Sequence, residues 1–134
     1  MKTKMSLMAL VLGLGLAACS NAKSFDIEGE VKAAGAVSDK IALEVFQIDT
    51  LDGKTTQNSV LKVTLDKLGA FKQKVDLTPG SKALVRAVAD KDGNAACTEG
   101  ELWAEAQIDK LDDSKANTVV LTLAAAPCPK AAAK

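Results

Sequence analysis

The sequence predicts an all-β domain, an antiparallel seven-stranded Greek-key sandwich that covers residues 25–128. Short stretches in which apolar and polar residues alternate recur through this range, and a period of two residues is typical of half-buried strands. Turn-forming residues separate these stretches, and no long segment with the 3.6-residue period of a helix lies between them. Many short strands with regularly spaced turns are typical of a sandwich.

Seven stretches carry the strand pattern. The stretch 40–49 has apolar residues on both faces, which indicates a central strand or a covered outer face. The stretch 83–89 is the most apolar and is interrupted only by Arg86. The stretch 100–108 is ambiguous, because its apolar residues alternate whereas Glu, Ala and Leu favour helices; we expect a strand. The predicted strands are residues 25–32, 40–49, 60–65, 71–77, 83–89, 100–108 and 117–124.

Residues with turn chemistry stand between the predicted strands. Asp52-Gly53 is a typical two-residue hairpin turn. In Pro79-Gly80 the proline presets φ, and the glycine adopts a positive φ without steric cost. The run Asp-Lys-Asp-Gly-Asn at 90–94 predicts a further turn, and residues 109–115 predict a charged loop.

Several short motifs resemble the transthyretin-like or carboxypeptidase-regulatory-like sandwich. They are a Gly-x-Val at 29–31, a Gly-x-Phe strand start at 69–71, a Leu-Thr-Pro-Gly turn at 77–80, and an apolar strand that leads into residues 90–94. The resemblance covers roughly residues 25–124 and implies this fold, with an immunoglobulin-like sandwich as the alternative. It also implies an accessory or adhesive module, and it implies no activity.

Residues 1–18 have the parts of a secretory signal peptide in the required order. Two lysines precede an apolar run over residues 5–16, and two alanines follow it. The run is too short to cross a bilayer as a stable helix. Leu16, the two alanines and Cys19 together resemble the lipobox of bacterial lipoproteins. The alternative is an ordinary secretory signal with a chance cysteine at the cleavage site.

The lipobox resemblance implies that Cys19 becomes the first residue and carries fatty acids, including palmitate, that anchor the chain to a membrane. Residues 19–24 then form the lipidated cysteine and a short tether. Lipoproteins of the enterobacterial type that stay in the inner membrane carry Asp after the cysteine, whereas Ser20 stands here. We therefore expect lipid anchoring in the bacterial envelope, at the outer membrane.

Charge and composition narrow the functions of the predicted mature chain. The full chain has 17 basic and 17 acidic residues, and loss of Lys2 and Lys4 with the signal leaves a net charge of −2. Without a basic excess, we expect no nucleic-acid partner. The chain has no His, which excludes Ser-His-Asp and Cys-His catalysis. We expect no enzymatic activity, no cofactor and no metal site.

Two cysteines remain besides the predicted anchor, Cys97 and Cys128. After export they face an oxidising compartment, where an even pair predicts a disulfide. The alternative is a pair of metal-binding or redox thiols, although the chain has no His and no Cys-x-x-Cys. Residues 129–134 show no periodicity and predict a disordered tail.

The stretch 90–105 holds the candidate ligand-binding residues. Asp90 and Asp92 could begin a Ca²⁺ loop with Glu99 or Glu101 as a later carboxylate, although a plain turn is the preferred interpretation of this stretch. Trp103 between Glu101 and Glu105 could stack on a sugar beside paired carboxylates. The preferred interpretation places Trp103 in the core, as the largest apolar side chain of an aromatic-poor domain.

These observations predict a membrane-anchored lipoprotein whose non-catalytic domain is a structural or protein-binding module of the envelope. The expected partners are the membrane, through the lipid, and another envelope protein. The alternative is a module that binds a glycan, a small ligand or Ca²⁺ through the 90–105 region.

Overall fold

The computed structural model describes residues 22–129, and within this range it contains seven strands and no helix. The predicted signal peptide, Cys19 and all but the first residue of the predicted tail lie outside the described residues. None of the described segments is a helix long and apolar enough to span a membrane. The strands are β1 (Lys23–Ala33), β2 (Ile41–Leu51), β3 (Lys54–Leu65), β4 (Gly69–Leu77), β5 (Lys82–Ala89), β6 (Leu102–Ile108) and β7 (Asn117–Ala125).

All seven strands belong to one curled sheet, with the order β3-β2-β5-β6-β7-β1-β4. The all-β prediction is therefore confirmed, including the strand expected in the ambiguous stretch 100–108. The prediction of an entirely antiparallel arrangement is wrong at one pair, because β1 and β7 run parallel. The alternation of apolar residues has the same period in both kinds of sheet, so it does not specify strand direction.

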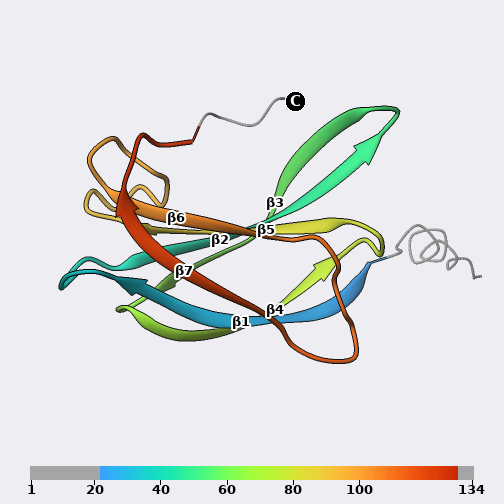
Figure 1. Ribbon diagram of the computed structural model, residues 1–134, viewed down its shortest axis with the longest axis horizontal. Helices are drawn as coiled ribbons and strands as arrows, with labels where there is room; N and C mark the ends of the chain where they lie inside the picture. Colours follow the sequence, from blue (N-terminus) through green and yellow to red (C-terminus); the bar gives the residue numbers. More distant parts are fainter. Residues whose placement is uncertain (1–21, 130–134) are drawn as a thin grey trace, which may run out of the picture.

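The curl brings the inner faces of the strands together around one hydrophobic core. In Figure 1, β2, β5 and β6 lie above β1, β4 and β7, and the core fills the space between these two halves of the sheet. In β7 the inward residues are buried while alternate residues are exposed. The most completely buried large side chains come from five strands: Ile27, Val31, Ile41, Leu43, Val45, Leu77, Val85 and Leu121.

Gly29 allows the close approach of β1 and β7. It pairs with Val119 of β7 on one side and with Phe71 of β4 on the other. A Cβ added to Gly29 would lie 1.9 Å from the backbone oxygen of Val119, far inside van der Waals contact. The glycine of the 29–31 motif is therefore required by the parallel pairing.

The strand register defines two opposite ends of the sheet. The end that we call proximal holds the start of β1, the 52–53 turn, the 78–81 turn and the 109–116 loop. The distal end holds connections 34–40, 66–68 and 90–101 and the segment 126–129. In Figure 1 the proximal end is on the right, and the loops of the distal end are on the left.

Replacement of Gly29 by alanine tests the close approach. We expect Gly29→Ala to lower the free energy of unfolding by about 2 kcal/mol or more, because the backbone of β1 and β7 must separate to admit a methyl group. Gly35→Ala is the matched control, since nothing lies within 4 Å of a Cβ there. Urea unfolding, followed by the fluorescence of Trp103, measures the stability of both variants. Equal unfolding midpoints for Gly29→Ala and Gly35→Ala would contradict this role of Gly29.

Candidate functional site

The loop 90–101 at the distal end gathers three of the predicted ligand residues. Asp90 follows the last residue of β5, and Glu101 precedes the first residue of β6. Carboxylate oxygens of Asp90, Asp92 and Glu101 lie within 4.8 Å of one another. Three converging carboxylates are an oxygen-rich set of the kind that Ca²⁺ prefers. The structure therefore brings together the acidic residues that the sequence singled out separately.

Glu101 is buried, with 3% of its surface exposed, and it closes the loop on itself. Its two carboxylate oxygens accept hydrogen bonds from the backbone N–H groups of Lys91 and Thr98, each at 2.7 Å. Charge-assisted bonds of this type are among the stronger hydrogen bonds in proteins. Glu101 therefore has a clear part in holding the loop, whether or not the loop binds a ligand.

The two aspartates differ in how their oxygens are used. Asp92 accepts a hydrogen bond from the Thr98 hydroxyl at 2.8 Å, and this bond is the main reason that the pKa of Asp92 is lowered. The Oδ2 atom of Asp90 accepts the N–H of Ala95 at 2.8 Å. Its Oδ1 atom is buried and has no hydrogen-bond partner among the described residues. Asp90 thus keeps one carboxylate oxygen uncommitted beside the other two acidic side chains.

A disulfide joins the loop 90–101 to the segment 126–129. Cys97 and Cys128, 31 positions apart, form the bond that the sequence predicted. Two further contacts run beside it: the N–H of Cys128 donates to Glu99 Oε2 at 3.0 Å, and the Trp103 indole N–H donates to the Ala126 carbonyl at 3.2 Å. The C-terminal segment is therefore attached to the loop and to β6 at three points.

Trp103 does not lie in the core, contrary to the preferred prediction. Leu102 and Ala104 pack against the core cluster, so the alternation of β6 places Trp103 on the opposite, outer face. The side chain is half-buried there and pairs with Val88 across the β5–β6 register. An indole also has an N–H group that needs a partner, which the outer face provides through Ala126.

The outer face of β2 and β5 is a second apolar layer. Its residues alternate with the core residues yet are almost fully buried: Ala42, Phe46, Leu84 and Val88. The 90–101 loop covers part of this layer, since Ala95, Ala96 and Cys97 enclose a cavity of about 50 Å³ with Ala42 and Val88. β2 is indeed central, with β3 and β5 as its neighbours, as its two apolar faces indicated.

Glu105 is separate from the acidic cluster and belongs to an ion pair on this outer face. Its Oε1 atom accepts a hydrogen bond from Nε of Arg86 at 3.0 Å and forms an ion pair with a terminal guanidinium nitrogen at 2.9 Å. The guanidinium carbon lies 4.8 Å from the centre of the Phe46 ring, a cation–π contact. Arg86 is the one polar residue of the most apolar predicted strand. Glu105 balances its charge, and its guanidinium group packs on Phe46.

Asn117, at the proximal end, has a structural role that was not predicted from the sequence. Asn117 is 7% exposed. Its amide nitrogen donates to the carbonyls of Asp26 and Asp112, each at 3.0 Å, and its amide oxygen accepts the N–H of Asp112 at 2.8 Å. These bonds attach the 109–116 loop to β1. An Asn between a charged loop and a strand is the only sequence signal of this function.

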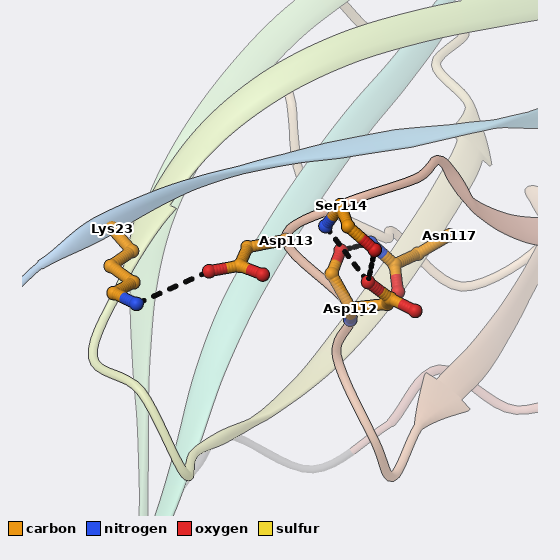
Figure 2. Close-up of polar contacts among 5 residues, drawn as sticks. All are labelled: Lys23, Asp112, Asp113, Ser114 and Asn117. Atoms are coloured by element: carbon orange, nitrogen blue, oxygen red, sulfur yellow. Dashed lines mark hydrogen bonds and ion pairs between the residues drawn. The ribbon is translucent and has the colours of Figure 1, made fainter.

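Three further contacts stabilise the 109–116 loop, as Figure 2 shows. Lys23, the first residue of β1, forms an ion pair with Asp113 at 3.2 Å. The hydroxyl and the N–H of Ser114 donate to Asp112 at 2.6 and 2.8 Å, and these bonds lower the pKa of Asp112. The place where the chain enters the domain is therefore fixed to a neighbouring loop.

Comparison of the chain with protein families, with characterised proteins and with solved structures finds no match. The lipobox and the transthyretin-like resemblance therefore stay predictions.

Replacement of Glu101 tests its role in the loop. We expect Glu101→Gln to lower the free energy of unfolding by about 2 kcal/mol, because the new amide nitrogen faces one of two backbone donors and leaves it unpaired. The control is Glu30→Gln, at an exposed position of β1. Urea unfolding measures the free energy of unfolding of both variants. An equal loss of stability in Glu101→Gln and Glu30→Gln would show that Glu101 does not hold the loop.

Proposed function

We propose that this chain is a lipid-anchored, non-catalytic β-domain of the bacterial envelope that acts by contact with another envelope protein. The supporting observation is where the chain enters the fold. β1 begins at Lys23, four residues after the predicted lipidated Cys19, and Lys23 lies at the proximal end. An anchor at Cys19 would hold the proximal end at the membrane and leave the distal end accessible. Outer-membrane location is part of this proposal, on the evidence of Ser20 alone.

The distal end is the better surface for a protein partner. Its largest loop, 90–101, is tied by a disulfide and by the buried Glu101, so little conformational entropy is lost when a partner binds. Exposed polar residues of the loop offer hydrogen-bonding groups at its surface. A Greek-key sandwich of the transthyretin-like or immunoglobulin-like kind remains the architecture that we propose for the domain; the face-to-face halves of the sheet support it.

Photo-crosslinking in cells tests the contact. We expect a photo-reactive amino acid at Ala96, which is exposed in the distal loop, to give one discrete adduct with an envelope protein. The same group at Lys72, exposed on the outer face of β4, is the matched control and should give none. Cys19→Ala should abolish the adduct, because the chain is no longer held beside its partner.

Two results would contradict the proposal. One is the same set of weak adducts from Ala96 and Lys72, which would indicate random collisions. The other is an adduct that persists at full yield in the Cys19→Ala variant, which would remove the need for an anchor.

A second candidate function is Ca²⁺ binding at Asp90, Asp92 and Glu101. The observation that favours it is the buried, unpartnered Oδ1 of Asp90 beside two other carboxylates. Calorimetric titration with Ca²⁺ should then show a heat of binding. Asp92→Asn should lower the affinity for Ca²⁺ at least tenfold, whereas Asp39→Asn, in the 34–40 loop, should leave the affinity unchanged. A flat titration of the unmodified protein would exclude this function.

A further inference from the structure

We infer that the proximal end of the domain lies on the lipid bilayer and that Leu51, at the tip of the β2–β3 hairpin, enters the headgroup region. This inference depends on the proposed anchor at Cys19 and extends it by naming the orientation of the domain and a residue that contacts lipid. It concerns the same membrane that the anchor would enter and requires no further partner.

The register places Leu51 at the end where the chain enters the domain. Lys23 pairs with Leu77, the last residue of β4, and Lys82, the first residue of β5, pairs with Ile48. β2 then continues for three residues beyond Ile48, to Leu51. Figure 1 shows the hairpin projecting at the right, on the side where β1 also begins. The hairpin tip and the start of β1 therefore face the same direction.

The length of the connection to Cys19 limits the orientation of the domain. Three residues separate Cys19 from Lys23, and a fully extended chain spans at most about 14 Å over these four residue-to-residue steps. The 11 residues of β2 extend about 36 Å. A connection shorter than half the length of β2 keeps the proximal end near the bilayer and the distal end away from it.

Leu51 is the most exposed large hydrophobic residue among the described residues. Its exposed fraction is 75%, compared with 59% for Val120 and 38% for Val60. Val120 lies within β7 and Val60 within β3, so neither is at the proximal end. Asp52 follows Leu51 in the chain, and Lys54 pairs with Leu51 across the hairpin. Because these two charges are opposite, the attraction to the membrane interface comes from apolar area.

The hairpin holds Leu51 in place before any contact with lipid. Asp52 and Gly53 have φ values of 53° and 77°, the left-handed pair of a tight two-residue turn. At the base, Gln47 accepts the N–H of Thr78 at 2.9 Å. Ser81 there donates its hydroxyl hydrogen to Asp49. The hairpin is thus attached to the 78–81 turn, and Leu51 cannot fold back onto the core.

A lipid surface explains this exposed residue better than a protein does. The neighbours of Leu51 on the hairpin are polar, including Thr50, Thr55 and Thr56. One leucine on a two-stranded tip offers far less area than the roughly 800 Å² per partner of a stable protein interface. Insertion of a single side chain needs no such area when an anchor already holds the domain at the membrane.

Tryptophan fluorescence of the lipidated full-length protein on phosphatidylethanolamine–phosphatidylglycerol vesicles tests the inference. The chain has one natural Trp, at the distal end, so the parent protein reports on that end. Leu51→Trp in a Trp103→Phe background reports on the hairpin tip. Binding to the vesicles should shift the emission of Leu51→Trp to the blue, and lipids brominated near the top of the acyl chains should strongly quench that emission. The emission of Trp103 in the parent protein should be unchanged in both measurements. Val120→Trp in the same background is the matched control and should be unquenched.

Each outcome has a distinct meaning. If the protein floats with the vesicles but the tryptophan at 51 is unquenched, or is quenched no more than the one at 120, the orientation is wrong although the anchor is present. If the lipidated preparation carries no fatty acid on Cys19 by mass spectrometry and does not float, both the anchor and this inference fail. Leu51→Trp in the parent background is the second variant, in case Trp103→Phe does not fold.

Discussion

The parallel pairing of β1 with β7 is the contact on which the rest of the structure depends. It attaches β1, and through it β4, to β7, which in turn pairs with β6 of the other half of the sheet. Without it the inner faces of the two halves would lose their common core. Because the first and last strands meet here, the pairing is a long-range contact of the kind that slows folding. Gly29 makes the contact sterically feasible.

Most strands were predictable because burial on one face imposes a period of two, and the turns were predictable where only certain residues fit. Asp52-Gly53 forms the expected hairpin turn. The pattern failed where burial did not select the residues: β3 begins at Lys54 and not at residue 60, because its first half is polar and exposed at the edge of the sheet. The alternation of apolar and polar residues could not predict that β1 and β7 run parallel, since this pairing depends on tertiary packing.

The candidate site was predictable as a group of residues but not in their roles. Asp90, Asp92 and Glu101 do converge, because the ends of β5 and β6 are adjacent in the sheet. The burial of Glu101 and its two backbone bonds could not be foreseen, since they depend on how the 90–101 loop folds over the outer face of β2 and β5. Trp103 shows the same limit: its size suggested the core, whereas register placed it outside.

The two ends of the sheet are stabilised by different means, and this difference agrees with the proposed division of their functions. At the proximal end, hydrogen bonds of Asn117 and an ion pair of Lys23 hold the 109–116 loop beside the entry of the chain. At the distal end, a covalent bond holds the 90–101 loop. In the proposed orientation the 90–101 loop is directed away from the membrane and has no surface to support it, so the disulfide and the hydrogen bonds of the buried Glu101 carboxylate would keep its shape for the proposed partner. A loop near the bilayer needs only enough order to fix where the tether leaves the domain. The asymmetry thus agrees with the proposed lipid anchor, which lies four positions before the start of β1.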